Sequence, residues 1–155
     1  MLRAFFCTTM KKLIDLLELA TKIDSRDAWM FAWSDADFRD MVLDIVRKRL
    51  LAEGTDKDGD VIGYYSPVTE MINPSKETGT PYTLNYTGEF FHSLFIEYNQ
   101  NEVITDGDGD KGDDNLFEKY GSGIIGLTTD NLAEVKEMVK DKYINYFNEN
   151  IRGAV

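Results

Sequence analysis

Two aspartate-rich segments carry the residues whose types and spacing come nearest to a chemical site. Asp56–Asp60 has aspartates at its first, third and fifth positions, and Asp106–Asp110 repeats this pattern. Alternate residues of a tight loop can direct their carboxylates at one hard cation, which is how a calcium-binding loop opens. A weak calcium site in either segment is therefore one hypothesis.

The rest of the calcium-loop template is absent from both segments. Its sixth position requires glycine for a sharp turn, and its twelfth requires a bidentate glutamate. These positions hold Val61 and Pro67 in the first segment, and Lys111 and Phe117 in the second. Aspartate and glycine are also common in solvated turns for backbone reasons. We favour that second interpretation.

Other residue patterns do not indicate catalysis. His92 is the single histidine and lies beside Ser93, whereas catalytic triads are assembled from residues distant in sequence. Gly121-Ser122-Gly123 lacks the lysine and following hydroxyl residue of a phosphate-binding loop. The sequence contains many carboxylates, but no feature identifies two of them as the catalytic pair of a glycosidase. We expect no enzyme activity, no cofactor and no metal, with a hydrolase centred on His92 as a remote alternative.

Composition fits one domain over residues 1–155, with 43% hydrophobic residues and an aromatic content of 12%. The formal net charge is −11, from 28 acidic and 17 basic residues. Such a surface repels phosphate, which argues against sequence-specific nucleic-acid binding. It is compatible with proximity to DNA that must slide without sticking, and equally with a role in solubility.

Few features of the sequence indicate where in the cell the protein is located. Cys7 is the single cysteine, so an intrachain disulfide and a cysteine-rich zinc site are excluded. No apolar run approaches the roughly 18 residues of a membrane span, and Ala4–Cys7 is too short for a signal sequence. We expect a soluble intracellular protein with no membrane partner, in which the sequon Asn85-Tyr86-Thr87 is not glycosylated.

Apolar periodicity predicts three long helices, over residues 10–23, 34–53 and 129–151. Ser34 is the expected N-cap of the second helix and Gly54 its end. Residues 94–105 predict a β-hairpin that turns at 99–101, and 116–120 predict a short helix. Residues 64–80 look irregular. The expected fold class is α+β, three long helices with a small antiparallel hairpin or sheet, and residues 1–33 form an aromatic-rich helical extension of unknown role.

Three ordered segments resemble a known family. They are Leu50–Ser66, a helix end followed by an Asp-x-x-Gly turn and an aromatic residue, Leu84–Leu94, with its Thr-Gly-x-aromatic turn, and Asn115–Thr128. Thr69 and Lys76 fit polar positions after the first. Together these segments resemble the Mu gpG-like virion morphogenesis proteins of tailed phages, which are related to tail-completion and head–tail joining proteins. Residues 1–33 have no counterpart in the pattern.

The resemblance implies a structural subunit of the virion, made in the host cytoplasm. Its partners would be other copies of itself in a ring, and neighbouring portal, connector or tail proteins. A ring needs heterologous, self-closing contacts from two different patches. We expect these at the aromatic residues of the last helix and at the hairpin. The alternative from another class is a calcium-binding module that uses the two aspartate segments.

Overall fold

The computed structural model describes residues 17–18, 21, 24–112 and 114–152. Most of the predicted helix 10–23 lies outside these residues, as does Cys7. The chain forms two compact units, Met1–Ala36 with Lys136–Val155, and Asp37–Val135. The prediction of a single domain stays a prediction.

In the first unit, α2 (Ser25–Ser34) follows its N-cap Asp24, whose side chain accepts the backbone N–H of Arg26. It buries Ala28, Ala32 and Trp33. Phe31 packs against Tyr146 of α7 (Thr129–Arg152) at 5.2 Å between ring centroids, and Asp35 pairs with Lys142. The bulky segment around Trp29 and Trp33 is therefore helical.

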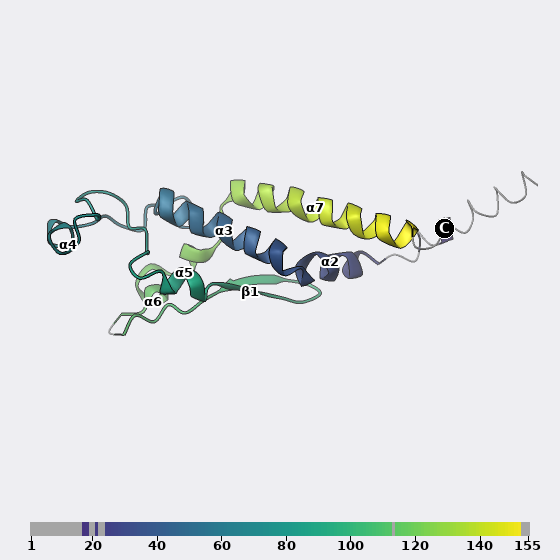
Figure 1. The fold of residues 1–155 in the computed structure, drawn as a ribbon, viewed down its shortest axis with the longest axis horizontal. Coiled ribbons are helices and arrows are strands. Elements are labelled where there is room, and N and C mark those ends of the chain that lie inside the picture. Colours follow the sequence, from purple (N-terminus) through teal and green to yellow (C-terminus); the bar gives the residue numbers. More distant parts are fainter. Residues whose placement is uncertain (1–16, 19–20, 22–23, 113, 153–155) are drawn as a thin grey trace, which may run out of the picture. The chain divides into compact units, whose positions relative to one another are not determined.

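The second unit begins with α3 (Ala36–Ala52), drawn in dark blue in Figure 1. Ser34 does not cap it, contrary to the prediction, because Ser34 ends α2 and its hydroxyl donates to the carbonyl of Phe31. Met41 is exposed and Leu43 is buried, since the buried face is centred on Val46. Gly54 ends the helix region in a left-handed conformation, φ 60°, as predicted.

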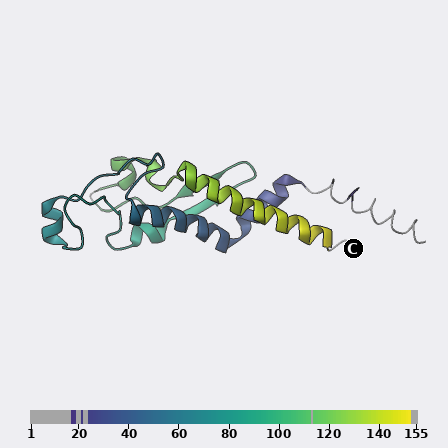
Figure 2. The ribbon, with the colours of Figure 1, turned by 90° about the horizontal axis from the view of Figure 1, so that it is seen from above.

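Residues 64–80 are not wholly irregular, because they contain α4 (Pro67–Ile72). Ser66 caps it by accepting the backbone N–H of Thr69, and Pro67 occupies its first turn. In both views α4 lies at the end of its unit away from the β1–β2 hairpin (Figure 1, Figure 2).

The predicted hairpin is confirmed, with β1 (Phe95–Tyr98) and β2 (Val103–Asp106) antiparallel and Phe95 opposite Asp106. The short α5 (Glu89–Ser93) precedes it. After it come α6 (Leu116–Tyr120) and the 3-10 turn η1 (Ser122–Ile125). Thr128 accepts the backbone N–H of Asn131 at the start of α7 (Thr129–Arg152). The core of this unit combines buried apolar side chains of α3, α5, β1 and η1: Phe38, Val42, Val46, Leu50, Phe90, Phe91, Ile96, Ile124 and Ile125.

The fold class is α+β, as predicted, with a two-stranded antiparallel sheet. In the part of the chain that the structure describes, no helix combines the length and the apolar character needed to cross a membrane.

Candidate functional site

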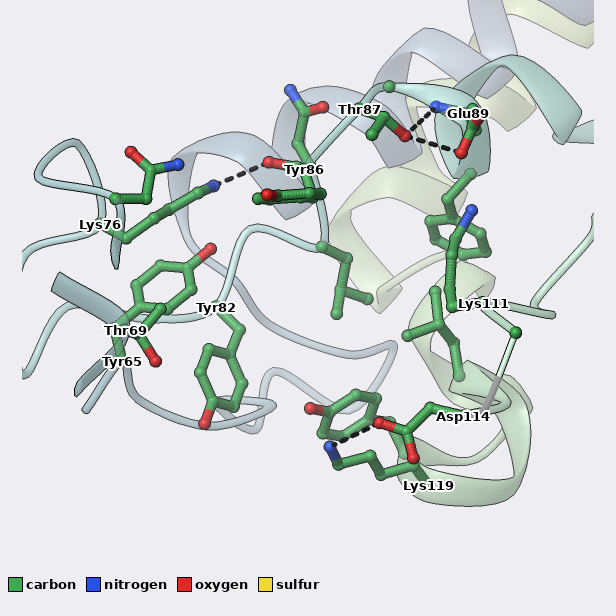
Figure 3. A pocket seen from close by; sticks show the side chains of 18 of the residues that line it. Tyr65, Thr69, Lys76, Tyr82, Tyr86, Thr87, Glu89, Lys111, Asp114 and Lys119 are labelled. Atoms are coloured by element: carbon green, nitrogen blue, oxygen red, sulfur yellow. Dashed lines mark hydrogen bonds and ion pairs between the residues drawn. The ribbon is translucent and has the colours of Figure 1, made fainter. Parts of the chain in front are cut away.

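The second unit contains an open pocket of about 770 Å³ between α4, the 82–90 segment and α6. Four tyrosines and several aliphatic side chains line it, together with lysines and carboxylates (Figure 3). We call it the tyrosine pocket after Tyr65, Tyr82, Tyr86 and Tyr120. No local pattern in the sequence predicts this pocket, because its walls come from three separate segments.

Tyr65, Tyr82 and Tyr120 form a connected row of rings. The rings of Tyr65 and Tyr82 meet edge to face at 4.9 Å between centroids, and Tyr82 lies 6.1 Å from Tyr120. Such pairs are worth about 1 kcal/mol beyond the area that they bury. Tyr86 is 80% exposed. The row therefore forms a preorganised aromatic wall with one tyrosine free to meet solvent or a partner.

Lys76 completes this wall. Its ammonium lies 5.1 Å from the centroid of the Tyr65 ring and donates to Thr83 Oγ1 at 3.0 Å and to the Asn85 carbonyl at 2.7 Å. Both acceptors are neutral, and among the described residues no carboxylate lies within ion-pair distance of it. The pKa of Tyr65 is lowered, because burial, which raises it, is outweighed by hydrogen bonds from Thr83 and Lys76 and by the charge of Lys76.

Close backbone approaches position the wall. A Cβ on Gly54 would lie 2.4 Å from the Tyr82 carbonyl oxygen and 2.6 Å from Pro81 Cβ. The N–H of Tyr82 also donates to the Gly63 carbonyl. Leu84, which lines the pocket, has φ 54°, a conformation that costs a non-glycine residue about 1–2 kcal/mol. The surrounding structure thus holds this wall in a defined shape.

The opposite wall is mixed in charge. Lys119 pairs with Asp114 at 3.7 Å and lies over Tyr120, while Glu89 accepts the Thr87 hydroxyl (Figure 3). Gly88 caps α5 at φ 84°. The wall formed by α4 and Tyr82, in contrast, contains no carboxylate among its lining residues.

Arg49 ties the end of α3 to η1 beneath this region. Its guanidinium is buried and donates to the carbonyl oxygens of Ile124 and Gly126. Burial lowers the pKa of Arg49, although the charges of Asp56 and Glu53 oppose that shift. No pattern of residue types in the sequence predicts this role of Arg49.

The aspartate segments use their carboxylates locally. Asp56 Oδ1 accepts the backbone N–H groups of Asp58 and Asp60, at 2.9 and 3.0 Å. Asp108 Oδ1 likewise accepts the N–H of Asp110. Within the described ranges, no three His, Cys, Asp or Glu side chains form a group that could hold a metal ion. The geometry gives the calcium hypothesis no support.

His92 and Ser93 are not brought into contact with each other. His92 Nδ1 lies 2.7 Å from the Gly88 carbonyl, one turn back along α5. Ser93 donates instead to Phe90 O and accepts the N–H of Asp108. Gly123 receives the backbone N–H of Lys57 at its carbonyl, so the Gly121–Gly123 segment serves a loop–loop contact.

Exposed apolar side chains gather around α4. Met71, Ile72 and Val68 are 84, 76 and 65% exposed, and the neighbouring Tyr64 is 57% exposed.

On the last helix, where we expected exposed aromatic residues, Tyr143, Tyr146 and Phe147 are instead half-buried. Burial raises the pKa of Tyr143.

Comparisons of the chain with protein-family profiles, with curated proteins and with solved structures give no match.

Proposed function

We propose that this chain is a structural subunit of a tailed-phage virion that forms a ring at the head–tail connector or completes the tail. In this role it binds copies of itself and neighbouring portal, connector or tail proteins, and it performs no catalysis. The virion and the specific partners come from the resemblance carried by Leu50–Ser66, Leu84–Leu94 and Asn115–Thr128.

The observation that carries the assembly part of the proposal is the apolar surface around α4. Val68, Met71 and Ile72 are all more than half exposed within six residues of chain. Contiguous exposed apolar side chains on a soluble protein mark interaction sites more often than chance exposure does. A subunit that must bind neighbours has a use for such a surface.

The packing of the three segments also supports the proposal. The N–H of Lys57 donates to Gly123 O at 2.9 Å, which joins the first segment to the third. Phe90 and Phe117 meet at 6.0 Å between centroids, which joins the second to the third. The residues that carry the resemblance therefore belong to one structural nucleus rather than to scattered loops.

The net charge of −11 is compatible with a subunit near the DNA path, because acidic surfaces do not hold a passing phosphate backbone.

The test is an infection in which the chain is not produced. Electron microscopy of the lysate should show heads and tails that are not joined, or tails of abnormal length. Expression of the wild-type chain in trans should restore complete particles. Complete, infectious particles formed without the chain would contradict the proposal.

A further inference from the structure

The outer face of the β1–β2 hairpin combines apolar and acidic side chains. Residues paired across the two strands point to the same side of a sheet. Phe95 is opposite Asp106, and Glu97 is opposite Ile104. Phe95 and Ile104 are 44 and 46% exposed, so each exposed apolar side chain on this face stands beside a carboxylate.

The α4 wall of the tyrosine pocket has the complementary character. It offers Val68, Ile72, Tyr65 and Tyr82 as apolar surface, and Lys76 as a cation whose hydrogen-bond acceptors are both neutral. The carboxylates that line the pocket, Glu89, Asp110 and Asp114, lie outside this wall. In a chain with a net charge of −11, an aromatic wall with an uncompensated cation is suited to an apolar ligand that carries carboxylates.

We propose that the tyrosine pocket binds the outer face of the hairpin of a second copy of this chain. Phe95 and Ile104 would pack against the aliphatic and tyrosine side chains of the α4 wall. Glu97 or Asp106 would approach Lys76. This inference rests on the proposed function in one respect, that copies of the chain associate, and it names the two surfaces that do so.

The two surfaces are different patches of one unit, with α4 at the end of that unit away from the hairpin (Figure 1). Contact between them is therefore heterologous, and each copy keeps one free pocket and one free hairpin after it joins the next. Repetition of such a contact gives a closed ring when the rotation closes. The proposed contact is therefore of the head-to-tail kind that a ring requires.

The test uses one variant for each surface. Ile72→Glu places a negative charge on the pocket wall at a 76% exposed position. Ile104→Glu places a negative charge on the outer face of the hairpin, at a 46% exposed position. Each variant alone should have an association constant at least about tenfold below that of the wild type, measured by analytical ultracentrifugation. Lys76→Gln, which keeps hydrogen-bond donors but removes the charge, should give a smaller loss.

Mixing the two variants distinguishes this contact from any other. The Ile72→Glu chain keeps an intact hairpin, and the Ile104→Glu chain keeps an intact pocket, whereas the two altered surfaces repel each other. An equimolar mixture should therefore form dimers with one wild-type contact and should not extend to larger rings. Lys48→Glu and Glu134→Lys are matched controls, because neither residue lines the pocket or lies on the hairpin. Circular dichroism verifies the folding of each variant.

Cross-linking detects a contact too weak to sediment. In a Cys7→Ser background, Ile72→Cys and Ile104→Cys chains should form a disulfide-linked heterodimer when mixed and oxidised. If both charge variants form the same oligomers as the wild type, the proposed contact is wrong, although the chain still self-associates. A wild-type chain that stays monomeric, with no Ile72→Cys to Ile104→Cys cross-link, would also overturn it. The place of the chain in particles, which tests the proposed function, is measured separately.

Discussion

Arg49 donates a hydrogen bond of 2.7 Å to the carbonyl oxygen of Ile124, which lies 75 residues further along the chain. A second bond of 2.5 Å reaches Gly126 O. Arg49 is only 5% exposed and Ile124 is fully buried. One buried cation thus fixes η1 against the end of α3.

Replacement of Arg49 by methionine should destabilise the second unit. The change leaves two carbonyl oxygens without donors in a buried site, which costs about 3 kcal/mol. Urea unfolding followed by circular dichroism measures this loss. Arg47→Met is the matched control on the same helix, because Arg47 is partly exposed and donates to one carbonyl, that of Phe91. Equal losses for the two variants would contradict the special role of Arg49.

Gly54→Ala should destabilise the protein more than Gly59→Ala. Both glycines have positive φ, 60° and 85°, so each substitution costs about 1–2 kcal/mol in backbone strain. At Gly54 the added methyl group would also overlap with backbone atoms of Tyr82. At Gly59 no atom lies within 4 Å of the added methyl group. The difference in the free energy of unfolding isolates the close approach that positions the tyrosine pocket. No difference would show that Tyr82 moves freely.

Calcium should not stabilise the chain. The Asp56 carboxylate accepts two backbone N–H groups. Loss of this carboxylate in Asp56→Ala should therefore lower the free energy of unfolding by about 1 kcal/mol. That loss should be the same with calcium and with a chelator, measured by thermal unfolding. A melting temperature that falls on chelation in the wild type, but not in Asp56→Ala, would revive the calcium-binding alternative.

Met71→Ser should leave stability within about 0.5 kcal/mol of the wild type, because Met71 is 84% exposed and makes little intramolecular contact. It should nevertheless reduce binding of an apolar fluorescent dye and incorporation of the chain into particles. Met41→Ser, at a 47% exposed position on α3, is the control. If the Met71→Ser chain is incorporated into particles as well as the wild type, α4 is not part of the assembly surface.

Local signals in the sequence predict much of the fold. The Asn99–Asn101 turn and the alternation on either side of it predict the hairpin, and Gly54 marks the end of a helix as expected. The prediction that Ser34 caps the second helix was wrong, because only Asp35 separates α2 from α3. Ser34, although its side chain can cap a helix, is the last residue of α2. The start of α4 did have a signal, Ser66 followed by Pro67, which the surrounding prolines and glycine obscured.

The tyrosine pocket could not be predicted in the same way. Tyr65, Tyr82 and Tyr120 belong to segments whose approach depends on the Gly54–Tyr82 contact and on α6. The partners of Arg49 are main-chain carbonyls, which leave no trace in residue types. Long-range packing of this kind appears only once the chain is folded.

The most direct test of the central claim is cryo-electron microscopy of purified virions with symmetry analysis. We predict a closed ring of copies at the head–tail junction or the top of the tail, with each hairpin bound in the tyrosine pocket of the next copy. Absence of the chain from every particle preparation would contradict its role as a structural subunit.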